Sequence, residues 1–344
     1  MVEFIKPIWQ DYDVEINTTA NTLNYEISDG QFIIYKGKAS KRPDSDTIKI
    51  RLSDFAKSDL NSDVEISWYY RDLVDDIRAY KIPNYCKTYK IKQGVNDLSE
   101  EVAFFNSYDY NDTKELESGV EILSLPISDK VVWWQPLFFT VYIDERLGGY
   151  YNNEFLVLDE DGDEFYQLSL EEGDGAYLIV IGTQYMEVGK KYECYFGGTV
   201  YRFEVIDDCN GKYPRYSLYY QNARGGYDTY PLFSVRNVES DDVEYQTYRA
   251  SGNNTDPNNP YNRRFQSNIT KKWELHTGWL NDRESKQMYQ ILTSHKVWLF
   301  DTYGSITPVV ITDKKVEYKT FTNEGRKKYY YTINVESANT IKKL

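Results

Sequence analysis

The stretch Asp46-Thr-Ile-Lys-Ile-Arg-Leu52 alternates apolar and polar residues, and this alternation decides the fold class of the chain. Ile48, Ile50 and Leu52 fall on one face of an extended backbone, and the two basic residues between them fall on the other. A period of two is typical of a half-buried β-strand. The same pattern recurs along the chain, rich in β-branched and aromatic residues and interrupted by Gly, Asp and Asn at intervals of roughly 8–12 residues. The sequence therefore predicts a mainly β protein with two sandwich- or barrel-like modules and a small C-terminal α+β module.

Two hairpins follow from this pattern. Residues 24–28 and 31–35 flank Asp29-Gly30, and glycine tolerates the positive φ that a tight turn requires. Residues 155–159 and 165–168 flank a second, strongly acidic turn. We expect both pairs of segments to form antiparallel strands.

Shifts in composition divide the chain into four segments. Residues 1–128 read as an N-terminal β-rich domain and 129–250 as a β-sandwich-like domain. Residues 251–261 are polar and rich in Pro and Asn, which is typical of a linker or exposed loop. Residues 262–344 differ because they contain one helical pattern among strands, which predicts an α+β domain.

The helical pattern in this last segment has a start signal and an apolar face. Asn281 followed by Glu284 matches an Asn version of the capping box, in which each side chain bonds to the backbone of the other residue. Met288, Ile291 and Leu292 then fall on one helical face. We expect this helix to pack on an antiparallel sheet.

Composition and charge exclude several classes of protein. The chain has 344 residues, with 40 Lys and Arg against 54 Asp and Glu, for a net charge of −14. This charge disfavours general binding to nucleic-acid phosphates and adhesion to anionic lipid. No apolar run approaches the roughly 18 residues of a membrane span, and the first residues lack the pattern of a signal peptide. Three cysteines without a CxxC spacing predict neither a disulfide framework nor a zinc site.

No catalytic pattern is recognisable. His276 and His295 are the two histidines, and neither has a neighbouring partner in a known catalytic arrangement. The acidic turn that begins at Asp159 fails as an EF-hand, because Glu164 occupies the glycine position and Leu170 the final glutamate position. We therefore predict a non-enzymatic protein with no catalytic residue, cofactor or metal ligand.

Aromatic residues supply the candidate interaction residues. Tyr is the outlier of the composition, at 34 residues. In a strand, Trp133 and Trp134 would face opposite sides, so one of them is available to a partner. The string from Tyr219 to Leu232 contains a Gly-Gly turn, and its simplest interpretation is a tight hairpin with an Arg–Asp pair. The candidate interface residues are Trp133, Trp134, Tyr219, Tyr220, Arg224, Tyr227, Asp228 and Tyr230. The segment 251–262 and the loop near Asp44 are further candidates.

Three stretches resemble one family of proteins. Tyr219-Tyr-Gln-Asn-Ala-Arg-Gly-Gly-Tyr-Asp228 resembles a tyrosine-rich element of virion proteins in crAss-like tailed phages of Bacteroides-type hosts. The segment from Phe32 through Arg42-Pro-Asp to Phe55 resembles an N-terminal module of the same proteins. The segment from Trp279-Leu-Asn-Asp-Arg through Val297-Trp-Leu-Phe to Lys314 resembles their C-terminal α+β module. Together the three cover under half of the chain.

This resemblance implies a structural component of the phage tail, such as a ring or hub protein of the tail barrel. Its partners would be copies of itself in a ring and other tail proteins, namely a portal-proximal ring, muzzle or fibre components. DNA would pass without specific binding, and no membrane insertion is expected. The protein would assemble in the host cytoplasm and reside in the virion tail. The alternative is a carbohydrate- or receptor-binding module associated with tail fibres, and a glycan hydrolase is a weaker third possibility.

Overall fold

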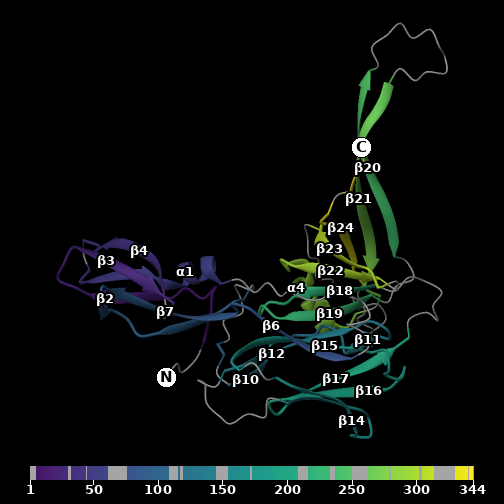
Figure 1. Cartoon of the computed structure of the whole chain (residues 1–344), viewed down its shortest axis with the longest axis horizontal. Helices are drawn as coiled ribbons and strands as arrows, with labels where there is room; N and C mark the ends of the chain where they lie inside the picture. The colour runs from purple at the N-terminus through teal and green to yellow at the C-terminus, as the bar shows by residue number, and fades with distance from the viewer. Residues whose placement is uncertain are drawn as a thin grey trace.

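The fold is mainly β, as the sequence predicts. This computed structural model describes residues 5–29, 32–43, 45–60, 76–107, 115–116, 119–144, 154–170, 173–207, 216–232, 237–249, 262–278, 280–301, 304–313, 330–339 and 341–343. Its strands form three regions, an N-terminal module, a central sandwich and a C-terminal sheet. Figure 1 shows the N-terminal module at one side of a layered body, and two strands of the C-terminal sheet projecting from that body. Both predicted hairpins are confirmed, since β3 pairs with β4 and β13 with β14 in antiparallel fashion.

The first region, the N-terminal module, packs two sheets and a helix around one core. Its elements are β1 (Lys6–Pro7), β2 (Asp13–Asn17), β3 (Thr22–Ser28), β4 (Ile33–Ser40), β5 (Thr47–Arg51), α1 (Leu52–Asp59), β7 (Cys86–Gln93), β8 (Asn96–Asp97) and β9 (Val102–Phe105). The larger sheet has the order β1-β9-β7-β3-β4, with β8 on β7, and β2 pairs with β5. Ile48, Ile50 and Leu52 are buried, which confirms the face inferred from the alternation. Helix α1 was not predicted, although Leu52 and Ala56 share its buried face.

The central sandwich holds two sheets against a shared apolar core. One sheet has the order β10-β12-β15-β6 and the other β11-β17-β16-β13-β14. Its strands are β6 (Ile77–Ile82), β10 (Val120–Ile122), β11 (Lys130–Val132), β12 (Leu137–Ile143), β13 (Glu154–Leu158), β14 (Glu164–Ser169), β15 (Gly175–Ile181), β16 (Lys191–Phe196) and β17 (Thr199–Ile206). Phe139 and Val141 of β12 face this core, while Phe138 and Tyr142 face a second core. Strand β12 is therefore covered on both faces, which explains why all of its residues are buried and why all but Thr140 are apolar or aromatic.

The C-terminal sheet contains eight strands in the order β19-β18-β22-β23-β24-β21-β20, with β25 on β21. They are β18 (Tyr216–Gln221), β19 (Tyr227–Leu232), β20 (Val238–Arg249), β21 (Asn262–His276), β22 (Val297–Asp301), β23 (Ile306–Ile311), β24 (Thr332–Ser337) and β25 (Ile341–Lys343). Helices α3 (Asp282–Gln287) and α4 (Tyr289–Leu292) pack on it. The capping box is confirmed in both directions, from Asn281 to Glu284 and back. Met288 and Ile291 are buried, as their helical spacing predicts.

Strands from different expected domains pair with each other, so the sheets do not follow the domain boundaries expected from composition. β6 lies within residues 1–128 but pairs with β15 of the sandwich. β18 and β19 lie within 129–250 but join the C-terminal sheet through β22. The structure therefore groups 77–82 with the sandwich and 216–249 with the C-terminal sheet, because strands find partners far away in sequence. The expected linker 251–261 lies outside the described residues, as does Asp44.

Candidate functional site

The tyrosine-rich string forms the hairpin β18–β19, which we call the junction hairpin, residues 216–232. Its turn is closed by Asn222, whose side-chain oxygen accepts hydrogen bonds from the backbone N–H groups of Arg224 and Gly226 at 2.9 and 3.1 Å. Gly225 has φ +77°, and a Cβ built there would lie 1.9 Å from the carbonyl oxygen of Asn106. Glycine is therefore required for two reasons, its backbone conformation and its contact with the N-terminal module.

The turn carries a buried ion pair. The Arg224 guanidinium lies 3.3 Å from the Glu121 carboxylate, and both side chains are almost fully buried. The hydroxyl of Tyr85 donates to the carbonyl oxygen of Arg224 at 2.7 Å. The expected partner of Arg224 was Asp228, and the structure corrects this to Glu121. A residue distant in sequence supplies the charge, and no local spacing could reveal it.

Asp228 anchors the sandwich to the hairpin instead. One of its carboxylate oxygens accepts from the Leu125 N–H and from the Asn222 side-chain amide, both at 2.9 Å. Burial raises the pKa of Asp228 to about 6, and the hydrogen bonds from Asn222, Ser124 and Leu125 lower it in part. The carboxylate is thus held in an environment that penalises its charged form.

Side chains of the sandwich also form hydrogen bonds with backbone groups of β19. The Thr140 hydroxyl donates to the carbonyl oxygen of Tyr227 at 3.1 Å and accepts from its N–H at 2.8 Å. In turn, the Thr229 hydroxyl accepts from the N–H of Phe138 at 2.8 Å. Strand β19 ends its sheet, yet these contacts cover its outer edge.

Aromatic stacking completes this junction. The ring of Tyr219 stacks on Phe138 at 4.2 Å between centroids, and its hydroxyl donates to the carbonyl oxygen of Pro136. Tyr220 and Tyr230 are buried in the core of the C-terminal sheet, and Tyr227 in the core that all three regions share.

The predicted interface residues therefore divide into two groups. Those of the string are buried within this chain and join its own modules, so they offer little surface to another molecule; they are Tyr219, Tyr220, Arg224, Tyr227, Asp228 and Tyr230. The tryptophan pair lies in a turn between β11 and β12 rather than in a strand. Trp133 is half-buried and donates its indole N–H to Gln184, and Trp134 has φ +67° and is 36% exposed. The strand-alternation argument fails there because the backbone turns.

Exposed apolar residues instead gather on two strands that end their sheets. On the N-terminal module, Phe32, Ile33, Ile34 and Tyr35 are between 36% and 68% exposed, at and before the start of β4. On β20, Val243 and Tyr245 are 42% and 57% exposed. The exposed residues at β4 have a sequence signal, which is a run of four apolar residues next to a turn. The exposed residues of β20 have no local signal, because their exposure depends on where the sheet ends.

The strands β20 and β21 form an arm, defined here as residues 238–249 and 262–276. They pair from Val238↔Glu274 to Arg249↔Asn262, and β25 supports β21 over Ser267–Ile269. Figure 1 shows the arm projecting away from the layered body. The ion pairs Glu239–Lys271 and Asp242–Lys272 bridge its two strands. β24 also pairs with β21 over Lys272–His276, so only the outer end of the arm is a two-stranded ribbon. A two-stranded ribbon is marginally stable in water, so this end gains stability from a partner.

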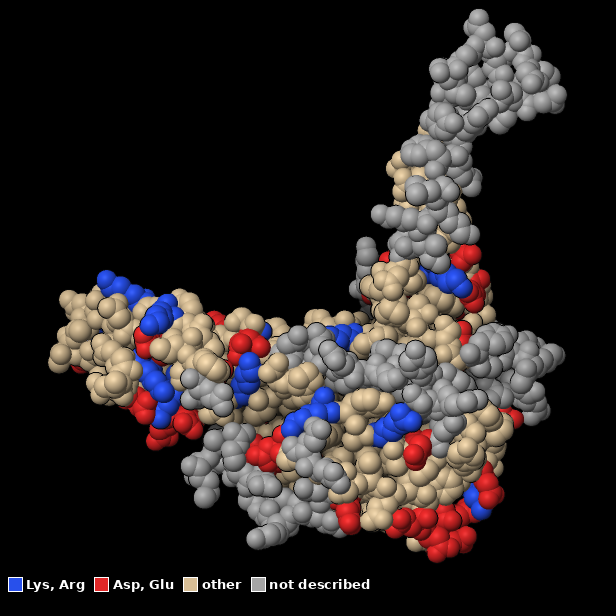
Figure 2. All heavy atoms as spheres, viewed as in Figure 1, with Lys and Arg blue, Asp and Glu red and all other residues tan. Residues whose placement is uncertain are grey.

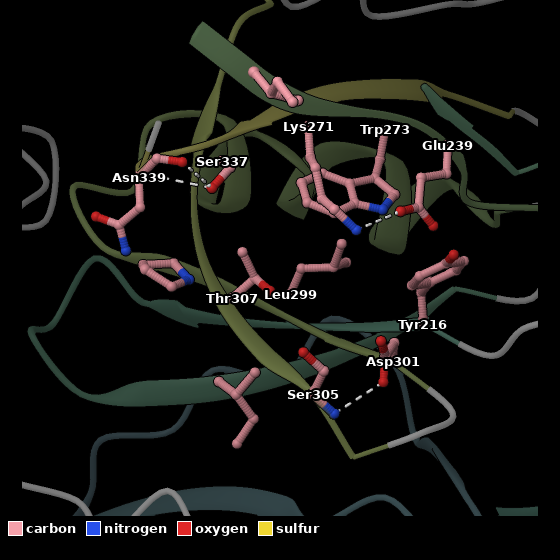
Figure 3. Close-up of a pocket in the computed structure, with 13 residues that line it drawn as sticks. Tyr216, Glu239, Lys271, Trp273, Leu299, Asp301, Ser305, Thr307, Ser337 and Asn339 are labelled. Carbon is pink, nitrogen blue, oxygen red and sulfur yellow. Dashed lines mark hydrogen bonds and ion pairs between the residues drawn. The ribbon is translucent and has the colours of Figure 1, made fainter. Parts of the chain in front are cut away.

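A hollow of about 340 Å³ lies at the base of the arm (Figure 3). Tyr216, Trp273 and Asp301 point toward it, and Lys271 lies at its edge in an ion pair with Glu239 that raises the lysine pKa. Both aromatic side chains are only 6% exposed. Little ring face is therefore available for stacking on a sugar.

The described residues contain no cluster of three His, Cys, Asp or Glu side chains able to hold a metal ion. His276 contacts the hydroxyl of Thr332 at 3.0 Å and lies 3.5 Å from Glu274. The acidic turn is closed by Asp159, which accepts from the N–H groups of Asp161 and Asp163. Within the described part of the chain, no helix is both long and apolar enough to cross a membrane.

Comparison with known proteins adds little. No protein-family model matches the chain, and no curated protein matches it. Among solved structures, domains 4–9 of the surface layer protein SbsC align with 86% of this chain at 10% identity and a TM-score of 0.20. Domains 1–6 of the same protein align with 88% at 10% identity and a TM-score of 0.21. The chain spans 58% and 42% of those two structures, and scores this low define no common fold.

Proposed function

We propose that this chain is a non-enzymatic structural subunit of a phage tail, a ring or hub component of the tail barrel. The observation that carries the structural role is the pair of exposed edge strands, β4 and β20, each bearing exposed apolar side chains. Natural β proteins usually cover or charge such edges, because an open edge pairs with other chains. β4 and β20 both carry charged residues, yet they also keep exposed apolar side chains at the ends of their sheets, and this combination is suited to assembly.

The internal construction of the chain supports the same role. The junction hairpin ties the three regions together through buried hydrogen bonds, a buried ion pair and stacked rings. A subunit braced in this way transmits load between the contacts at its ends. The assignment to a phage tail rests on the sequence resemblance of the three stretches described above.

Charge supports passage of DNA without binding. The net charge of −14 repels phosphate, which suits a protein that lines or surrounds a DNA conduit. Figure 2 shows acidic atoms gathered at the lower right of the body, near β14 and β16. A lumen lined mainly by Lys and Arg in the assembled particle would contradict this part of the proposal.

Cryo-EM of native virions tests the assignment, since a ring component appears at a fixed copy number around the tail axis. Deletion of residues 251–260 supplies a second test, because this segment joins the two strands of the arm. We expect the deleted chain to remain folded, with an unchanged circular dichroism spectrum, while particle assembly fails. Normal particles from this deletion would count against a role of the arm in assembly.

A further inference from the structure

Two edge strands of this chain have opposite charge. β4 and β20 each end a sheet and are exposed, whereas β19, at the other end of the C-terminal sheet, is buried throughout. β4 carries two lysines and no acidic residue, and β20 carries four acidic residues and a single arginine. Strands with complementary charge and free backbone edges are suited to pair with each other.

β4 changes from apolar to basic along its length, from Ile33 and Ile34 to Lys36 and Lys38. Alternation places Lys36 and Lys38 on the same face. Ile34 lies at a bulge, because the pairing of β3 with β4 shifts register between Ile27 and Ser28. Lys36 is engaged by Glu26 of the neighbouring strand at 2.7 Å. Lys38 is exposed, and in the described part of the chain it has no acidic partner within 4.0 Å. Its charge is therefore available to a second molecule.

On β20, one face changes from acidic to apolar. Asp241, Val243 and Tyr245 share this face. Lys271 and Lys272 are hydrogen-bonded to the carboxylates of Glu239 and Asp242. Asp241 is exposed and lies opposite Lys271, whose pKa is raised by its hydrogen bond with Glu239 and also by the charge of Asp241. That lysine forms its close ion pair with Glu239, and Asp241 has no ion pair within 4.0 Å among the described residues.

Antiparallel alignment of the two strands brings opposite charges together. With Lys38 opposite Asp241, Lys36 lies opposite Val243, and the apolar start of β4 runs alongside Tyr245. The exposed Lys38 then meets an acidic residue, and exposed apolar side chains of the two strands lie next to each other. We propose that β4 of one copy adds to β20 of a second copy as an antiparallel strand in this register. This inference rests on the proposed function and names the partner of the two edges.

The contact must be intermolecular. In Figure 1, β4 lies on the N-terminal module to the left of the body, and β20 lies on the arm that rises from the upper right of the body. A contact between two different surfaces of identical chains is heterologous, so it repeats from copy to copy. Such contacts give a ring where the rotation closes and a filament where it does not.

Charge reversal tests the contact in the full-length chain. Sedimentation velocity up to about 100 µM covers the range of weak interfaces. We expect Lys38→Glu and Asp241→Lys each to weaken self-association at least tenfold, and the double variant to recover most of it. Lys191→Glu and Glu164→Lys are matched controls, because they make the same charge changes at exposed positions of β16 and β14. These controls should associate like the wild type.

Cysteine cross-linking tests the register. An equimolar mixture of the Lys38→Cys and Asp241→Cys chains should form a disulfide between the two introduced positions, detected by mass spectrometry of linked peptides. A mixture of Lys38→Cys with Thr247→Cys, six residues further along β20, should not.

The outcomes separate this inference from the function on which it rests. If the wild type assembles and the two charge variants assemble equally well, the β4–β20 contact is wrong and the structural role survives. If the wild type stays monomeric over the whole concentration range, both proposals fail. Recovery in the double variant together with the Lys38–Asp241 cross-link supports the contact and its register.

Discussion

Gly225 is the residue at which the fit between modules is tightest. A Cβ there would lie 1.9 Å from the carbonyl oxygen of Asn106, and the φ of +77° disfavours any other residue. We expect Gly225→Ala to lower the free energy of unfolding by about 2–4 kcal/mol, combining strain and overpacking. Urea denaturation measures this loss.

Gly198 provides the matched control for this substitution. It has φ +79°, and a Cβ at this position would meet no other atom within 4 Å. Gly198→Ala therefore carries the backbone penalty without the clash, and should cost about 1–2 kcal/mol. Equal losses at the two positions would show that the contact with Asn106 does not matter.

Asp228 makes the stability of the junction depend on pH. Its pKa is about 6 in the folded chain, because burial disfavours the charge, and about 3.9 when unfolded. Between these values the folded state holds more protons at Asp228, so the contribution of this group to stability is largest below about pH 4 and falls as the pH rises toward 6. The loss from this group is on the order of 2–3 kcal/mol.

Replacement of this carboxylate isolates its contribution. Asp228→Asn keeps an acceptor for Leu125 and removes the buried charge, so it should flatten the dependence of stability on pH between 4 and 6. Urea midpoints at several pH values measure the slope. Equal slopes in the variant and the wild type would assign the pH dependence to other groups.

At the scale of elements, the helix start at Asn281 is set by local chemistry. The side-chain oxygen of Asn281 accepts a hydrogen bond from the backbone N–H of Glu284 at 2.9 Å. The carboxylate of Glu284 accepts one from the backbone N–H of Asn281 at 2.8 Å. Asn281→Ala should cost about 1 kcal/mol of stability, whereas Asn281→Asp retains the acceptor and should cost little. Thermal denaturation followed by circular dichroism compares them, and an equal loss in both would exclude capping as the cause.

Turns, hairpins and helix starts were predictable from the sequence, because each is specified by residues close together in the chain. The hairpin β3–β4, the acidic turn and the capping box each depend on residues within a few positions. The ion pair of Arg224 was missed because its partner lies 103 positions away. The exposure of β20 was missed because periodicity identifies a strand without showing which strands lie beside it. Helix α1 was missed because its short buried face continues the apolar alternation of β5.

At the scale of the whole molecule, the junction hairpin couples the three regions energetically. It contacts the N-terminal module through Tyr85 and Asn106, the sandwich through Leu125 and Thr140, and the C-terminal sheet through β22. Regions joined through a shared core unfold together when the coupling exceeds their separate stabilities.

We therefore expect one calorimetric transition in the wild type, with equal calorimetric and van't Hoff enthalpies. Gly225→Ala should produce a second transition at lower temperature, in which the N-terminal module unfolds separately. The reason is that the substitution separates this module from the turn of the hairpin. Gly198→Ala should shift the transition without splitting it. Two well-separated transitions in the wild type would show that the hairpin does not couple the regions.

The position of this hairpin late in the sequence also governs how the chain is made. The hydroxyl of Tyr85 donates a hydrogen bond to the carbonyl oxygen of Arg224, which is synthesised 139 residues later. At roughly 5–20 residues per second, a ribosome needs about 7–28 s to synthesise that interval. During this time the first third of the nascent chain leaves the ribosome with its contact site for the turn unfilled. The chain is thus most exposed to misassociation midway through translation, when chaperone binding to the polysome would be greatest.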